Sequence, residues 1–314
     1  MKNSRYYILL ISGTVLLSSC EKDVDFKGKE LSPKIAVNSI IHAKSDTGVI
    51  KISESVFDYS DRQPGLVENP EIHVSINEKE CQVWLDTVMG VHACYKFVSI
   101  LNIGDRLEFS AHTPGHGTVR GFDIVPSIAE IRNIESSWFK RDGFGYLRLY
   151  ITLKDNPLER NFYRIVVRTN DIIVHPSIQE PDSHWDLKEI FVDDEILFNN
   201  ASEKNEDGKT LDYYRIFSDE MFSGKEYTLN VYIRNDNFAT DVQSDYVRQS
   251  VKVEIQTLSE KLYQNLHSQE LASGTTGDVF SEPVKIYTNI QGGYGILGIY
   301  NSTEKEKTVA KKGD

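Results

Sequence analysis

The sequence predicts a mainly β protein built from two β-sandwich-like domains, the second carrying one packed α-helix near its C-terminal end. Aromatic residues that favour strands are abundant, with 16 Tyr and 14 Phe among 314 residues. Short segments of alternating apolar and polar residues follow one another, separated by turn residues. Only one segment has the residue spacing of an amphipathic helix. Together these observations favour sandwiches over helical or mixed α/β folds.

The first sandwich is expected over residues 31–126. Its clearest strand places Ile72, Val74 and Ile76 on one face, as strict alternation requires. Similar short segments surround it, among them KIAVNSIIHA, VIKISESVF and DRLEFSAHT. Pro126 stands where this series of strands ends, so we expect the domain boundary there.

A second set of strands and one helix define the domain expected over residues 127–304. Its strand segments include GYLRLYITLKD, NFYRIVVRT, KEYTLNVYIR and SVKVEIQTL. The helix is expected near residues 259–272, because Ser259 is a good N-cap and Leu262 and Leu266 recur one turn apart. The polar residues 305–314 are expected to form a frayed tail.

The N-terminal residues 1–19 read as a signal peptide. Lys2 and Arg5 precede an apolar run of about 12 residues, whereas a membrane-spanning helix needs about 20. The run ends in Leu-Ser-Ser-Cys, which resembles a bacterial lipobox and predicts that Cys20 becomes the lipidated first residue of the mature chain. The alternative is a secretory signal followed by a coincidental cysteine. Two acyl chains, such as diacylglycerol, are enough for stable membrane attachment.

Residues 20–30 are expected to form a flexible, lipidated tether. The stretch from Glu21 to Asp25 is charged and resembles the pattern that directs some lipoproteins to the outer face of the outer membrane, although Val24 interrupts the acidic pair. The alternative is an ordinary polar tether. The net charge of −12 disfavours nucleic acid as a partner and disfavours broad contact with anionic lipid. The lipid alone is therefore expected to hold the protein at the membrane.

The two remaining cysteines, Cys81 and Cys94, flank a predicted hairpin. An envelope location permits a disulfide, and two thiols on adjacent strands could face each other, so we expect them to be bonded. Two free buried thiols are the alternative. We expect no metal at this pair, because no further ligands occur at a recognisable spacing.

Two further features are candidates for contact with other molecules. Aromatic side chains gather after the domain boundary and could stack on sugar rings or anchor a partner, although packing in the core is the commoner fate of such residues. They are Trp138, Phe139, Phe144, Tyr146 and Trp185. Asp86-Thr87-Val88 resembles a short bacterial O-glycosylation signal, which makes Thr87 a candidate acceptor.

Signatures of catalysis are missing from the sequence, so we expect no enzyme activity, no metal and no cofactor beyond the lipid on Cys20. There is no Gly-x-Ser-x-Gly motif, and the glycine-rich QGGYGILG is not followed by the Lys-Ser/Thr of a phosphate-binding loop. His112 and His116 are four residues apart, but Pro114 and Gly115 exclude a helix that would align them on a metal. Acidic clusters lack calcium-loop spacing.

Several segments of the chain resemble segments of one protein family and occur in the same order as they do in that family. They include GDRLEFSAHTPG, LKDNPLERNFYRIVV, FSDEMFSGKEYTL, VEIQTLSEKLYQNL and SEPVKIYTNIQGGYGILGIYN. Together they resemble the Bacteroidetes lipoproteins called domain of unknown function 4249 (DUF4249). The resemblance implies an outer-membrane, surface-exposed lipoprotein that works as a ligand-binding or accessory module beside a TonB-dependent transporter. It supplies no site residues, and a structural or adhesive surface protein is the alternative.

Overall fold

A computed structural model describes residues 32–56, 64–173, 184–192, 214–234, 247–275 and 284–309. The chain divides into two compact units, and the larger one, residues 33–55 and 64–314, contains every strand and helix described below. None of the helices in the described ranges is both long and apolar enough to cross a membrane. Cys20 and the tether expected over residues 20–30 lie outside the described residues.

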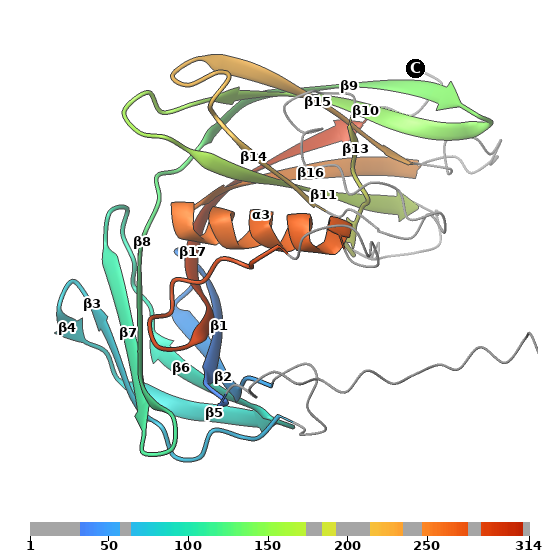
Figure 1. Cartoon of the computed structure of the whole chain (residues 1–314). Helices are drawn as coiled ribbons and strands as arrows, with labels where there is room; N and C mark the ends of the chain where they lie inside the picture. Colours follow the sequence, from blue (N-terminus) through green and yellow to red (C-terminus); the bar gives the residue numbers. More distant parts are fainter. Residues whose placement is uncertain are drawn as a thin grey trace, which may run out of the picture. The chain divides into compact units, whose positions relative to one another are not determined.

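The largest sheet, sheet A, has nine strands in the order β12-β11-β16-β17-β1-β2-β6-β5, with β14 also paired to β11 (Figure 1). The β1–β17 pair is parallel and the other pairs are antiparallel. Its strands are β1 (Ile35–His42), β2 (Thr47–Glu54), β5 (Val83–Met89), β6 (His92–Val98), β11 (Phe162–Ile173), β12 (Asp186–Leu187), β14 (Tyr214–Ser218), β16 (Val247–Leu258) and β17 (Tyr294–Val309).

Two four-stranded antiparallel sheets complete the strand inventory of the described residues. Sheet B has the order β4-β3-β7-β8 and consists of β3 (Glu71–Ile76), β4 (Lys79–Glu80), β7 (Arg106–Thr113) and β8 (Gly117–Ile124). Sheet C has the order β13-β15-β10-β9 and consists of β9 (Glu130–Arg141), β10 (Phe144–Lys154), β13 (Phe191–Val192) and β15 (Glu226–Arg234).

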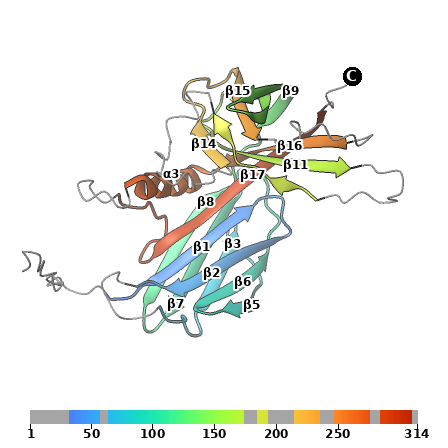
Figure 2. The same ribbon diagram turned by 90° about the vertical axis from the view of Figure 1, so that its right-hand side faces the viewer.

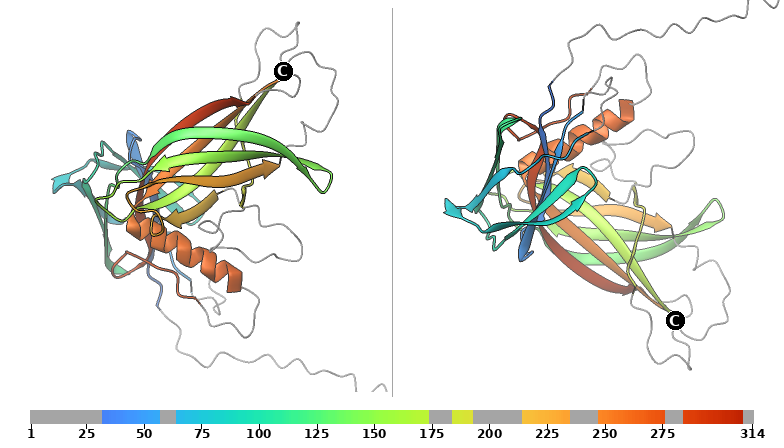
Figure 3. Two further views of the ribbon diagram at one scale, coloured as in Figure 1. Left: turned by 90° about the horizontal axis from the view of Figure 1, so that it is seen from above. Right: turned by 90° about the horizontal axis from the view of Figure 1, so that it is seen from below.

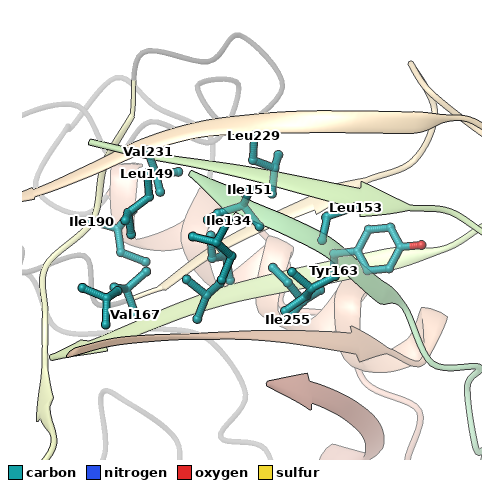
Figure 4. Close-up of a cluster of buried hydrophobic side chains, with 14 of the residues drawn as sticks. Ile134, Leu149, Ile151, Leu153, Tyr163, Val167, Ile190, Leu229, Val231 and Ile255 are labelled. Atoms are coloured by element: carbon teal, nitrogen blue, oxygen red, sulfur yellow. The ribbon is translucent and has the colours of Figure 1, made fainter. Parts of the chain in front are cut away.

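Each small sheet covers one half of sheet A and encloses a hydrophobic core. Sheet C packs on β11 and β16, where Leu149, Ile151 and Val231 meet Val167 and Ile255 (Figure 4). Sheet B packs on β1, β2 and β6 around a second core. In Figure 3 the strands of sheet C run broadly along those of β11, β16 and β17, as in an aligned sandwich. The predicted mainly β, two-sandwich fold with one helix is confirmed.

The long strand β17 belongs to both cores. Its first half pairs with β1 and places Leu297 and Ile299 in the sheet B core. Its second half pairs with β16 and places Val309 in the sheet C core. The frayed tail expected from residue 305 is therefore wrong over residues 305–309, because ladder pairing to β16 and burial of Val309 order them despite their polar composition.

The parallel pairing of β1 with β17 requires an unusually close backbone approach. Gly295 has φ of +100°, and a Cβ atom there would lie 1.8 Å from the carbonyl oxygen of Val37. Glycine alone fits, because any side chain would both clash with this backbone and strain the dihedral. The glycine-rich stretch of the sequence thus serves strand packing.

The helix expected near residues 259–272 is confirmed as α3 (Glu260–Thr275). The Leu262 backbone N–H donates to Ser259 Oγ at 3.2 Å, so Ser259 is the N-cap. Leu262 and Leu266 form a third apolar cluster with Phe162 and Ile296. This cluster packs the helix against sheet A (Figure 1).

A buried carboxylate joins three elements at the start of this helix. Asp123 of β8 is 2% exposed, and its Oδ2 accepts hydrogen bonds from Ser259 Oγ at 2.5 Å and from the Ile299 N–H of β17 at 2.8 Å. Burial raises the pKa of Asp123 from 3.8 to about 6, against the opposing effect of these hydrogen bonds.

Asp123 therefore predicts a pH-dependent stability. Its pKa is higher in the folded chain than in the unfolded chain, so its contribution to stability is complete below about pH 4 and is lost as the pH rises through 6. We expect the free energy of unfolding of Asp123→Asn to lack this fall, which amounts to about 3 kcal/mol. Urea titrations between pH 4 and 7 measure it, and Asp142→Asn, which alters an exposed side chain, should follow wild type. Parallel curves for wild type and Asp123→Asn would contradict the assignment.

Gly295→Ala is expected to lower the free energy of unfolding by more than about 3 kcal/mol, because the new methyl group meets the β1 backbone and the positive φ is strained. Gly115→Ala is the matched control, since nothing lies within 4 Å of its Cβ and its φ is not positive. We expect the control to stay within about 0.5 kcal/mol of wild type in urea denaturation. Equal stability of the two variants would show that the strands do not approach this closely.

Candidate functional site

The outer face of sheet B carries a hollow of about 370 Å³, called here the sheet B groove. Strand alternation creates its lining, because Leu107 and Ala111 of β7 point into the core while Glu108 and Ser110 point outward. The groove is lined by His73, Ser75, Arg106, Glu108, Phe109, Ser110, Arg120, Gly121, Phe122, Asn289 and Gln291.

One wall of the groove is a segment that precedes β17 and is fixed to β8. The Gln291 N–H donates to the Arg120 carbonyl at 2.7 Å, and the Arg120 N–H donates to the Gln291 carbonyl at 3.1 Å. The Asn289 amide donates to the Leu297 carbonyl at 2.7 Å and accepts from the Leu297 N–H at 3.0 Å. These bonds use both ends of the Asn289 side chain, so Asn289 holds the wall in place.

Two cations enclose the ring of Phe122 in the groove. The Arg106 guanidinium lies 3.6 Å from the ring centroid, and Lys261 Nζ lies 2.9 Å from it. Lys261 also donates to the Phe122 carbonyl at 2.8 Å. The pKa of Lys261 lies below its usual value. Burial is the main cause and Arg106 adds to it, while the negative charge of Asp123 opposes the shift. The first turn of α3 thus places a positive charge against Phe122, one of the residues that line the groove.

Charges already paired within the groove differ from those that are available to a ligand. Glu108 is held by Arg106, with Oε1 at 2.9 Å from Nη2 and 3.0 Å from Nε. By contrast, the exposed side chains of Arg120 and Gln291 make no hydrogen bond or ion pair to the described part of the chain. A guanidinium fork and an amide are therefore free to bind a polar ligand.

The far end of the groove is marked by His73 between two carboxylates. Its Nδ1 lies 3.0 Å from Glu80 Oε1 and its Nε2 lies 3.2 Å from Glu71 Oε1. Hydrogen bonds to Glu80 and then to Glu71 raise the pKa of His73 above 6.5. Both carboxylates therefore stabilise the imidazolium form of His73 relative to its neutral form.

His112 and His116 do not converge on a metal. His112 Nδ1 contacts Thr118 Oγ1 at 2.8 Å, while His116 Nε2 lies 2.7 Å from Glu54 Oε1. The buried Thr113 contacts His116 twice. Its Oγ1 lies 3.1 Å from His116 Nδ1 and also accepts the His116 backbone N–H. This constellation therefore ties a turn to β2. Over the described ranges, no group of three or more His, Cys, Asp or Glu could hold a metal ion.

The structure brings together two of the five predicted aromatic residues. Phe139 and Tyr146 stack with centroids 5.3 Å apart on the outer face of sheet C. Trp138 is partly buried against the core, so it does not share that face. Phe144 lies under Arg234 at 3.8 Å, and Trp185 lies under Lys252 at 4.3 Å.

Sequence reasoning missed the partners of this aromatic pair. Tyr232 meets Phe139 at 5.5 Å and Phe191 at 5.4 Å, and Arg148 covers Phe139 at 4.6 Å. Alternation along KEYTLNVYIR could have placed Tyr232 on the outer face. It could not have shown that β13 and β9 reach the same surface.

The expected disulfide between Cys81 and Cys94 is not formed, and both cysteines are free. The hairpin register is the reason, because Cys94 stands opposite Thr87 of β5. Cys81 lies six residues earlier, and at about 3.3 Å per residue this separation is far beyond the reach of a disulfide. The alternative of two free buried thiols therefore holds for Cys94, whereas Cys81 is free but only half-buried.

The predicted glycosylation acceptor Thr87 is exposed on β5, next to a register shift between Leu85 and Thr87. Its hydroxyl-bearing side chain is therefore accessible, as an acceptor must be, and modification of Thr87 stays a prediction.

Comparison with known proteins assigns the chain to a family. Residues 21–306 match the domain of unknown function DUF4249. The chain belongs to this family. No curated protein matches it. The name DUF4249 describes a shared sequence and leaves the activity of its members undefined.

Solved structures add little to this assignment. The adhesin InvE of Yersinia pseudotuberculosis is 11% identical, with 70% of this chain and 54% of the adhesin covered and a TM-score of 0.21. The DUF4249 chain thus spans about half the length of that adhesin. A structure of manganese lipoxygenase of Gaeumannomyces graminis with part of zonadhesin of Komagataella pastoris is also 11% identical, covering 88% of this chain and 95% of that one, with a TM-score of 0.16. Neither likeness is close enough to support an argument about function.

The two carboxylates at the groove end predict the titration of His73. We expect Glu80→Gln with Glu71→Gln to lower the pKa of His73 toward 6.5, because both hydrogen bonds favour the imidazolium. The titration of the His73 ring protons by NMR measures this. Glu226→Gln, on the other sandwich, should leave the pKa unchanged. An unaltered His73 pKa in the double variant would exclude the contacts.

Proposed function

We propose that this DUF4249 protein is an outer-membrane lipoprotein, exposed at the cell surface, that binds a ligand in the sheet B groove as an accessory module of a TonB-dependent transporter. The observation that carries the proposal is the groove itself. Its volume of about 370 Å³ lies within the range of about 300–1,000 Å³ typical of small-molecule sites. An aromatic ring, free donors and fixed cations converge on it, as in sites that orient a ligand.

The leader supports the location. Cys20 follows the apolar run and the Leu-Ser-Ser residues of a lipobox, so we propose that a lipid on Cys20 anchors the protein in the outer membrane. The partner is proposed from the resemblance to Bacteroidetes lipoproteins that accompany TonB-dependent transporters. Nucleic acid is not proposed as a partner, because the net charge of −12 repels phosphates.

We assign no catalytic step to the groove. Among the described residues that line the groove, Glu108 is the one carboxylate, and it already forms an ion pair with Arg106. Paired carboxylates or a nucleophile beside a base would be expected of a hydrolase. The groups that line the groove are suited to recognition, so a non-enzymatic role is the simpler proposal.

The proposal is tested in intact cells with the full chain. We expect protease to degrade the surface-exposed protein, crosslinking to recover a TonB-dependent transporter, and Cys20→Ala to leave the membrane fraction. Ser19→Ala, which keeps a small residue before the cysteine, should remain in the membrane. Protection of the wild-type protein from protease would overturn the surface location. Repeated crosslinking without any transporter would overturn the partnership.

A structural or adhesive role is the second candidate, favoured by β5. This strand is the end of sheet A, and beyond Val83 all its residues are exposed (Figure 2). Trp84, Leu85, Val88 and Met89 are each at least 40% exposed. An open apolar edge can add a strand from a second copy. Oligomers of the delipidated protein that dissociate in Leu85→Lys would favour this role, and a monomer at all concentrations would exclude it.

A further inference from the structure

We infer that the sheet B groove recognises a carboxylate, with the Arg120 guanidinium as its direct partner and Phe122 supporting the body of the ligand. This inference rests on the proposed ligand-binding role of the groove and adds the chemical class of the ligand. Two kinds of small molecule carry this chemistry, an acidic sugar and an amino-acid or peptide carboxylate.

The first argument is the local sign of the charge. The protein as a whole carries −12, yet Arg106 and Arg120 line the groove and Lys261 contacts the ring of Phe122, which also lines it. The single lining acid, Glu108, is already bound by Arg106. A positively charged groove on an otherwise acidic protein attracts small anions and raises their local concentration at the groove.

The second argument is that two of the cationic side chains are held by contacts within the protein, whereas the side chain of Arg120 is available to a ligand. Arg106 is fixed by its stacking on Phe122 and its bonds to Glu108, and Lys261 is fixed by its bond to the Phe122 carbonyl. These two supply potential from fixed positions. Arg120 keeps its whole guanidinium fork unused by the described residues, so it can bind both oxygens of a carboxylate.

The third argument is that the backbone of Arg120 is held in place. Both of its backbone polar groups bond to Gln291, which places the free amide of Gln291 on the neighbouring strand position. A fixed backbone limits the entropy lost when the side chain binds. Ser75 and Ser110 on the groove lining offer hydroxyls to the rest of the ligand, as a sugar or peptide would need.

The dimensions favour a small ligand over a polyanion. A nucleic-acid surface needs a basic stripe along an extended face. Here the cations surround one groove, and Glu71 and Glu80 flank His73 at its end. An extended polyanion would meet these carboxylates, whereas a single carboxylate beside Arg120 would not.

The test measures binding of glucuronate and N-acetylglutamate to the mature lipidated protein in detergent, by calorimetry, with glucose and inorganic phosphate as comparison probes. We expect one of the two carboxylates to bind better than glucose and phosphate, and the preferred one identifies the source. Arg120→Ala should weaken that binding about 10- to 100-fold, as expected for loss of hydrogen bonds to a charged group. Arg120→Lys should restore part of it, because it keeps the charge without the fork.

Arg132→Ala is the matched control and should bind as wild type does. Arg132 lies on β9 of sheet C and pairs with Glu130 and Glu226, whereas the groove strands belong to sheet B. Thermal midpoints confirm that each variant folds. Equal binding of carboxylates and glucose, or wild-type affinity in Arg120→Ala, would overturn the inference. If glucose binds and Phe122→Ala abolishes that binding, the carboxylate inference is overturned although the groove is still a ligand site. Transporter crosslinking tests the proposed function separately.

Discussion

The close parallel pairing of β17 with β1 is the constraint on which the rest of the structure depends. It brings the segment Ala36–His42 against Tyr294–Tyr300 and is possible because Gly295 has no side chain to meet Val37. With β17 in this position, both hydrophobic cores close and α3 finds Ile296 to pack against. The wall of the sheet B groove is the chain that leads into this strand. The positive φ of Gly295 is therefore needed both for the fold and for the position of the groove wall.

Asp123 connects this strand to the groove. Its carboxylate binds the Ile299 N–H and the Ser259 hydroxyl, so the N-terminus of α3 is fixed relative to β8 and β17. Lys261 follows two residues after the cap and reaches Phe122 from there. The energetic cost of burying the carboxylate is thus partly offset by hydrogen bonds, which also fix the N-terminus of the helix that carries Lys261. Stability and the proposed recognition share the same few atoms.

Local patterns predicted the parts of the structure that depend on neighbours along the chain. Alternation of Ile72, Val74 and Ile76, the Ser259 cap and the Leu262–Leu266 spacing all follow from short-range rules. The groove could not be predicted, because it combines strands near residue 73 and residue 106 with a segment near residue 290. The disulfide was wrongly expected for a related reason, since strand register decides which residues face each other. Residues 305–309 were assigned to a tail because their ladder partners, Gln249 to Val253 of β16, lie 52 to 60 residues earlier in the chain.

The central position of β17 in sheet A has a consequence for biogenesis. Lys44 bonds to the Ser302 carbonyl across 258 residues of chain, and β1 and β16 have no common neighbour until β17 arrives between them. During synthesis the N-terminal strands are made first, and the edge of β1 that pairs with β17 stays open until β17 has been made. Such long-range pairing folds slowly and leaves aggregation-prone edges open in the meantime. Sheet A can therefore close only after the chain has been made as far as residue 309, the end of β17.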